Sequence, residues 1–282
     1  MPAPAPTSAD PHAGNARPAA DPHAGHAMPA DDGPPVAPPP AEALSGAQHA
    51  ADTVFGAGAM EGSRYALRHE HGGMRTGRIL IDRAEIRVRD GGDGYAIEGD
   101  AWYGGDYDKL WLKSEIEGTF GEKVEAAEIQ TLWSRPIGPF FDLQAGVRYD
   151  VRPDPETAHL VLGIQGLAPY WFEVDGALFL SHRGDVTARI EAEYDQRITQ
   201  KLILQPAIEF DIAAQDVPEI GVGRGFSAVE AGLRLRYEFV PEFAPYVGVN
   251  YERALGRTAD FRRLAGEDVG GWNLVFGIRA WF

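Results

Sequence analysis

The stretch that decides the fold is Phe140–Val151, which reads Phe-Phe-Asp-Leu-Gln-Ala-Gly-Val-Arg-Tyr-Asp-Val. Apolar side chains occupy every second position: Phe141, Leu143, Ala145, Val147, Tyr149 and Val151. Polar or charged side chains fill most of the positions between them: Asp142, Gln144, Arg148 and Asp150. Because successive side chains of a strand point to opposite faces, this alternation predicts a β-strand with one apolar face and one ionic face.

The same alternation recurs along the chain and predicts about twelve strands. The clearest further cases are 109–118, 186–197, 201–212 and 229–239, and weaker ones are 76–89, 94–103, 124–134, 158–166, 171–181, 245–253 and 272–282. Glycine-rich or proline-rich turns separate several of them, as at 90–94 and 136–139. Strands without helices between them predict an all-β fold. Because their number is even, we expect a closed antiparallel up-and-down barrel over residues 76–282.

A soluble β-protein would show the same alternation, so the membrane assignment needs further support. The last strand ends on an aromatic residue, Phe282, as the C-terminal strands of bacterial outer-membrane proteins do. No segment after residue 75 has a convincing helical period, so closure is the simplest way to remove the edges of such a sheet. Apolar runs such as 167–172 are far shorter than the roughly 20 residues of a transmembrane helix. These features favour a transmembrane barrel.

Aromatic residues near the expected strand ends predict belts at the two membrane interfaces. The residues are Trp102, Tyr103, Trp111, Trp133, Tyr170, Trp171, Tyr246, Tyr251 and Trp272.

The N-terminal part has a different composition. Residues 1–58 are mainly Pro, Ala, Gly, Asp and His, which predicts a disordered tail because so few apolar groups cannot offset the entropy of ordering. Residues 59–75 form an expected linker that contains His and Met. No secretory signal is visible in 1–30, so we expect that the numbering begins after a removed signal, with a cytoplasmic start as the competing interpretation.

Composition also limits the partners. The chain has no Cys, which excludes disulfides and thiolate metal sites. Its formal net charge of −16 disfavours nucleic acid and would attract cations. No nucleophile elbow, phosphate-binding loop or zinc-enzyme motif stands out, so we expect no enzyme.

Long stretches of the ordered region resemble the copper resistance protein B family, an outer-membrane component of bacterial copper-resistance systems. The stretches that carry this resemblance are 99–115, 141–150, 165–175, 191–195, 202–206, 232–238 and 243–246. The resemblance implies copper tolerance, copper binding, an envelope location and no known enzymatic activity. Tails in the family are often longer and richer in Met-His motifs, whereas this one is mainly Pro and Ala.

Copper ions favour imidazole and, in the cuprous state, thioether sulfur, which makes the His and Met residues the candidate ligands. In the tail these are His12, His23, His26 and Met28, and the sequence Asp-Pro-His-Ala-Gly occurs twice, at 10–14 and 21–25. In the linker they are His69, His71 and Met74, where Gly72 and Gly73 would let Met74 fold back in a loop. The alternative is that these histidines are only solvated, and we expect structural or solvent roles for His159 and His182.

The ionic strand faces predict a charged lumen. The expected inward acids are Asp142, Asp150, Glu173, Asp175, Glu191, Glu193 and Glu209, and the expected inward bases are Lys113, Arg148, Arg189, Arg234, Arg236 and Arg279. Because unpaired buried ions are costly, we expect a largely paired plug rather than a cation-conducting path.

Together these patterns predict a copper-binding protein of the bacterial outer membrane that contributes to copper resistance by sequestration or by export across that membrane. The tail would capture copper in the periplasm. The expected partners are copper ions, outer-membrane lipid and periplasmic copper-handling proteins, and no nucleic acid. The alternative is a general small-solute pore without copper specificity. A third hypothesis, an outer-membrane enzyme acting on lipid, lacks a candidate triad.

Overall fold

The computed structural model describes residues 45, 49–89 and 92–282. Residues 1–64 and 65–282 form two units, each described by itself. In the first unit, α1 (Asp52–Phe55) is followed by the beginning of α2 (Ala57–His71), and Arg64 forms an ion pair with Asp52. Helix α2 covers most of the expected linker. None of the helices in the described ranges is long and apolar enough to cross a membrane.

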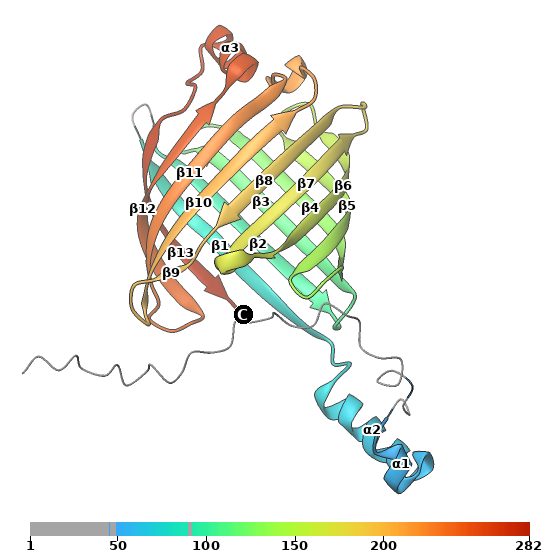
Figure 1. Ribbon diagram of the computed structural model, residues 1–282. Helices are drawn as coiled ribbons and strands as arrows, with labels where there is room; N and C mark the ends of the chain where they lie inside the picture. The colour runs from blue at the N-terminus through green and yellow to red at the C-terminus, as the bar shows by residue number, and fades with distance from the viewer. Residues whose placement is uncertain (1–44, 46–48, 90–91) are drawn as a thin grey trace, which may run out of the picture. The chain divides into compact units, whose positions relative to one another are not determined.

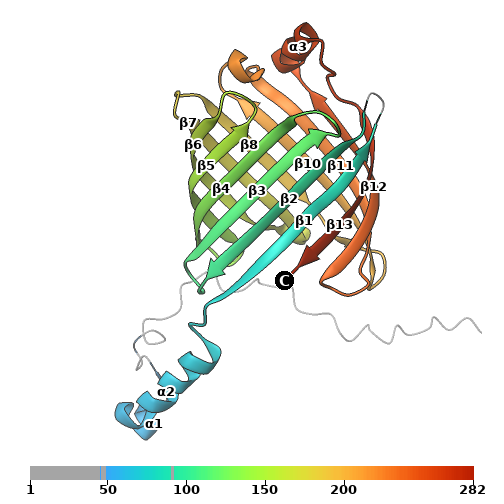
Figure 2. The same ribbon diagram turned by 180° about the vertical axis from the view of Figure 1, so that it is seen from behind.

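The second unit is a single antiparallel sheet. Its strands are β1 (Thr76–Val88), β2 (Gly94–Gly104), β3 (Lys109–Thr119), β4 (Val124–Pro136), β5 (Phe141–Arg152), β6 (Thr157–Ala168), β7 (Phe172–Ser181), β8 (Val186–Glu193), β9 (Gln196–Arg197), β10 (Leu202–Ala213), β11 (Gly225–Tyr237), β12 (Phe243–Ala254) and β13 (Trp272–Trp281). Each long strand pairs with the next, and β13 pairs with β1. The sheet is therefore a closed barrel (Figures 1 and 2).

The closed barrel confirms the predicted fold. The two-residue strand β9 continues the line of β8 after a break at Tyr194 and Asp195, and both pair with β10. The ring consequently has twelve positions, as the alternation predicted. Each of the twelve predicted segments overlaps one strand of the ring, and the predicted and observed strand ends differ by a few residues.

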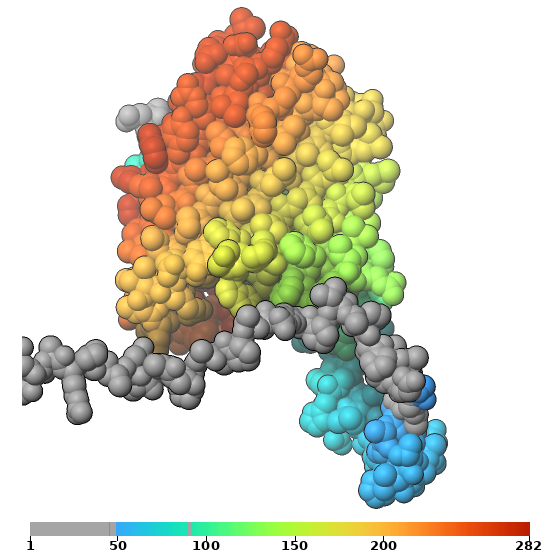
Figure 3. Space-filling view, viewed as in Figure 1, coloured from blue at the N-terminus to red at the C-terminus, as the bar shows by residue number. Residues whose placement is uncertain are grey.

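The outer wall of the barrel is apolar. Strand residues such as Leu160, Leu162 and Leu178 are exposed, and Figure 3 shows the side chains packed into a continuous wall on this face. So large an apolar surface is stable against lipid and unfavourable in water. In a closed barrel, the backbone N–H and C=O groups of every strand are hydrogen-bonded to the neighbouring strands, so the wall can face lipid. The apolar outer surface therefore identifies an outer-membrane barrel.

The two ends of the barrel differ. Strand β1 begins and β13 ends at the same end, and the helix α3 (Gly256–Ala265) lies at the opposite end (Figure 1). The connections at the α3 end include the two longest in the barrel, 214–224 with the short helix η3 (Pro218–Ile220) and 255–271 with α3. At the other end the connections are short, as in 105–108 and in η2 (Pro169–Trp171).

Helix α3 was not expected from the sequence. It has ten residues, the Leu255 that precedes it makes no side-chain cap, and only Thr258 and Ala259 are buried. Gly266, with φ of 77°, ends it in the left-handed conformation that favours glycine. A helix that buries so small a face carries no apolar period for a sequence pattern to reveal.

Candidate functional site: an acidic lumen

Strand register brings carboxylates side by side on the inner wall. Glu98, Glu115 and Glu128 are direct cross-strand partners on β2, β3 and β4. On the facing wall, four acids line up in the same way across β7, β8, β10 and β11: Asp175, Glu191, Glu209 and Glu230. Like charges directly opposite each other destabilise a sheet. Basic groups or bound cations must therefore offset these rows.

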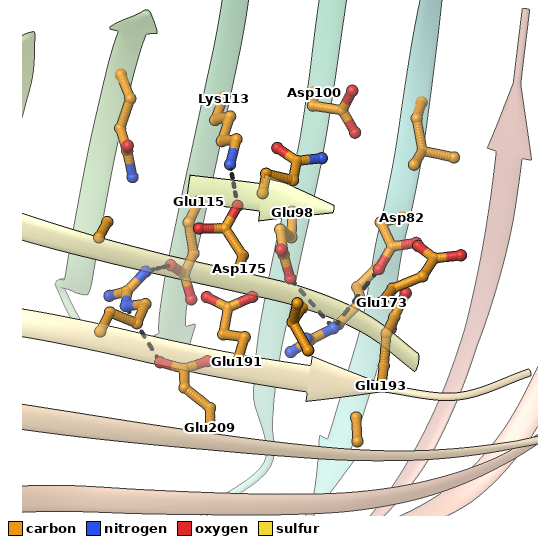
Figure 4. A pocket seen from close by; sticks show the side chains of 18 of the residues that line it. Asp82, Glu98, Asp100, Lys113, Glu115, Glu173, Asp175, Glu191, Glu193 and Glu209 are labelled. Carbon is orange, nitrogen blue, oxygen red and sulfur yellow. Dashed lines mark hydrogen bonds and ion pairs between the residues drawn. The ribbon is translucent and has the colours of Figure 1, made fainter. Parts of the chain in front are cut away.

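A cavity of about 550 Å³ lies between the two walls. Its lining holds eleven carboxylate side chains and six basic ones. Figure 4 shows the labelled acids converging on this space, with Asp82, Glu98, Asp100 and Glu115 on one wall and Glu173, Asp175, Glu191, Glu193 and Glu209 on the facing wall. A cleft lined mainly by one sign of charge concentrates ions of the opposite sign. The lumen can therefore attract cations and repel anions.

The six predicted inward bases all form ion pairs. Arg148 pairs with Glu128 at 2.7 Å and Asp150 at 2.6 Å, and Lys113 reaches across the lumen to Asp175 at 2.5 Å. The remaining pairs join Arg189 to Glu115, Glu128, Glu209 and Asp211, Arg234 to Glu85, Arg236 to Asp195 and Glu238, and Arg279 to Asp82. The bases are thus paired as the sequence predicted.

The acids are not all paired. Glu173, Glu191 and Glu193 form no ion pair with any residue that the structure describes, although Gln205 Nε2 donates a hydrogen bond to Glu193 at 3.0 Å. Carboxylates therefore remain in excess around the cavity. The lumen is less completely paired and less completely filled than the plug that the sequence predicted.

A second polar cluster lies where the barrel closes. The Glu85 carboxylate, on β1, accepts hydrogen bonds from Arg87 Nε at 3.0 Å, from Arg234 at 3.1 Å through both Nε and Nη2, and from the Tyr246 hydroxyl at 3.0 Å. Glu85 is fully buried, with a side chain 0% exposed. Because its partners lie on β1, β11 and β12, these contacts tie the closing strands together.

Three of the predicted belt residues, Trp102, Trp111 and Tyr246, lie inside the barrel, so that prediction was wrong for them. Trp111 is 7% exposed and packs with Leu132, Val161 and Phe179, while Tyr246 is 5% exposed. Trp102 packs against the same cluster and stacks on Trp111, with ring centroids 6.2 Å apart. The lumen needs volume as well as charge, and these side chains fill part of it. Trp171 and Trp272 are exposed, as expected.

The sequence also missed acids and bases on β1. Asp82 and Arg83 are consecutive and yet both line the cavity, because the register shifts between Ile81 and the residues that follow. Such a bulge breaks the alternation and leaves no periodic signal. Glu98 and Asp100 do alternate on β2, so the pattern that identified the other strands could have found them.

The predicted metal ligands fall into two groups, one outside the described residues and one at the end of α2 and just after it. His12, His23, His26 and Met28 lie outside the described residues. His69 and His71 belong to the last turn of α2, where His69 stacks on Tyr65 with centroids 5.9 Å apart, and Met74, 60% exposed, follows the helix. Residues two apart in a helix do not face each other, so His69 and His71 are not brought together. Within the described ranges, no three His, Asp or Glu side chains are arranged to hold a metal ion.

Solved structures similar to this chain include two porins. A NanC porin structure has a TM-score of 0.48 at 11% identity and covers 72% of this chain and 98% of its own. A KdgM porin has a TM-score of 0.44 at 12% identity, with 73% and 99% covered.

Sequence comparisons give closer relatives. Copper resistance protein B of Escherichia coli is 43% identical over 204 residues, which are 72% of this chain and 69% of that protein. A copper resistance protein B homolog of Pseudomonas syringae pv. tomato (strain ATCC BAA-871 / DC3000) is 40% identical over 228 residues, with 79% and 77% covered. The family model described as "Copper resistance protein B precursor (CopB)" matches residues 75–282. The chain therefore belongs to the copper resistance protein B family.

Proposed function

We propose that this protein contributes to copper resistance by binding copper ions and either holding them at the outer membrane or passing them through it. The observation that carries the proposal is the excess of carboxylates around the luminal cavity, which favours cations over other solutes. The name of the family supports copper as the cation, and it describes resistance rather than a reaction.

We further propose that the His and Met residues before β1 are the first copper ligands. Imidazole and thioether groups bind copper more strongly than carboxylates do, so a tail carrying His12, His23, His26 and Met28 would capture ions that the acidic lumen only concentrates. His69, His71 and Met74 would form a second set. Because α2 separates His69 from His71, one ion bound by both requires the last turn of the helix to open.

The tail faces the periplasm in this proposal. Outer-membrane barrels have short periplasmic turns and longer extracellular loops. The connections 214–224 and 255–271 at the α3 end favour that end as the extracellular one. The start of β1 would then be periplasmic, where copper-handling proteins could deliver ions to the tail.

Copper titration of the full-length purified protein in both oxidation states tests the proposal. We expect that changing His12, His23, His26 and Met28 to Ala lowers the number of tightly bound ions, and that changing His69, His71 and Met74 to Ala does so separately. His49→Ala is the matched control, because His49 is an exposed histidine outside both sets. Unchanged copper stoichiometry in both multiple variants would rule out these ligands.

The alternative, a general pore, predicts a different result. A pore without copper specificity would conduct small ions in planar bilayers equally well with and without copper. It would also bind no copper in the titration above. Copper binding that is lost with the His and Met residues therefore separates the two functions.

A further inference from the structure

The lumen contains a second cavity beyond the first. This smaller cavity, of about 220 Å³, is lined by Arg253 and by Arg262 of α3, so it lies toward the α3 end. The larger cavity reaches toward the opposite end, where Arg78 lines it near the start of β1. The two cavities therefore follow each other along the lumen.

Five side chains line both cavities: Glu115, Glu128, Arg189, Glu209 and Glu230. We call these five residues the luminal partition. Four of them are acids, and Arg189 is the single base among them. Lys113 and Asp175, which also pair across the lumen, line only the larger cavity.

Arg189 joins the two walls at the partition. From β8 its Nη1 lies 2.9 Å from Glu115 on β3, and its Nη2 lies 3.4 Å from Glu128 on β4. Its Nε lies 3.2 Å from Glu209 on the neighbouring strand β10. The dashed lines that reach Glu115 and Glu209 in Figure 4 mark two of these pairs. One guanidinium thus contacts three of the four glutamates of the partition.

We propose that Arg189 closes the lumen between the two cavities. Its side chain fills the passage and its charge repels an approaching cation, while Glu115, Glu128 and Glu209 hold it in place from both walls. Rings of Asp or Glu are the selectivity elements of cation channels. Without the guanidinium, Glu115 and Glu209 would lose their ion pairs, while Glu128 would keep Arg148 and Glu230 would keep Arg83 and Arg87. The partition would then be acidic and open, and it would let cations through.

Single-channel recording of the full-length protein in planar bilayers with KCl tests this inference. We expect Arg189→Gln to raise the conductance several-fold over the wild type, and the reversal potential in a KCl gradient to shift toward K⁺. Arg279→Gln is the matched control: it removes the same charge from the larger cavity, but Arg279 pairs at 2.7 Å with Asp82 on the adjacent strand. Its conductance should stay at the wild-type level.

Equal conductance of Arg189→Gln and the wild type, or an equal rise in Arg279→Gln, would overturn the inference. Heat-modifiable migration on gels checks that each variant forms a closed barrel. If Arg189→Gln does not fold, the double variant Glu115→Gln/Glu128→Gln decides, because it frees Arg189 from the opposite wall and leaves its contact with Glu209. This double variant should also conduct more than the wild type. If it conducts only as much as the wild type, Arg189 does not close the lumen. The recordings contain no copper, so their outcome is independent of the proposed function.

Discussion

At the scale of single residues, Glu85 is a carboxylate that is buried away from water and depends on its partners to compensate its charge. Its buried carboxylate accepts four hydrogen bonds, and it is the carboxylate that pairs with Arg234, itself 3% exposed. A buried ion pair contributes to stability only while both partners are present. When one partner is removed, the other remains as an uncompensated charge away from water.

We therefore predict that Glu85→Gln lowers the free energy of unfolding by about 3–5 kcal/mol, the usual loss when one partner of a buried pair is removed. Arg87 keeps Glu117 and Glu252 as partners, so the loss arises mainly at Arg234. Urea unfolding in lipid vesicles, followed by gel migration, measures it. Glu122→Gln, at an exposed turn between β3 and β4, is the control. If both variants unfold at the same urea concentration, Glu85 does not stabilise the closure.

Some side chains of the inner wall could be predicted from the sequence and others could not. Charged residues such as Glu191 and Arg189 were predicted to face inward because charges on a lipid-facing surface are costly. Trp111 and Tyr246 could not be assigned in this way, since an aromatic side chain is stable both at a membrane interface and inside a filled lumen. Only the register of their strands decides between the two places.

At the scale of elements, the closing pair β13–β1 depends on a glycine. Gly277 lies opposite Glu85 on β1 and opposite Tyr246 on β12. A Cβ atom at this position would lie 2.5 Å from Tyr246 Cζ and Oη and 2.8 Å from Glu85 Cβ. The missing side chain thus lets the Tyr246 hydroxyl reach across β13 to Glu85.

Gly277→Ala should consequently weaken the closure by about 1–3 kcal/mol, the usual cost of overpacking, because Tyr246 must move away from Glu85. Gly176→Ala on β7 is the matched control, since its Cβ would meet only Ile164 Cγ2, at 3.8 Å. Urea unfolding of both variants in vesicles measures the difference. A Gly277→Ala barrel as stable as the Gly176→Ala barrel would contradict the role given to the glycine.

The strands were predictable as elements because lipid on one side and a polar lumen on the other impose a strict period of two. Three features escaped the pattern for local reasons. The bulge at Asp82 and Arg83 adds a residue to one strand, the break between β8 and β9 interrupts a strand, and α3 buries only two side chains. Each of these features alters the backbone locally, and the residue types around it give no sign of the change.

At the scale of the whole molecule, closure and strand number could be predicted by counting, whereas the division of the lumen could not. The luminal partition combines residues from β3, β4, β8, β10 and β11, which are up to 115 positions apart in the chain. No local pattern relates Glu115 to Arg189. Their contact follows from the tilt and closure of the barrel as a whole.

Orientation in the membrane is also a property of the whole molecule, and protease access can test it. The proposed orientation exposes Arg257, Arg262 and Arg263 of α3 outside the cell and keeps Arg68 and Arg75, before β1, in the periplasm. Trypsin added to intact cells should therefore cut the α3 connection and leave the N-terminal side whole. Permeabilising the outer membrane should add the cuts at Arg68 and Arg75.

Detergent-purified protein shows whether trypsin reaches both regions when no membrane protects them. A variant with Arg257, Arg262 and Arg263 changed to Gln should lose the cuts within 256–265, which assigns those cuts to α3. Because the start of β1 and α3 lie at opposite ends of one closed barrel, the two regions cannot share a compartment. Cutting before β1 in intact cells, with α3 protected, would mean that the barrel has the reverse orientation and that the His and Met residues meet copper outside the cell.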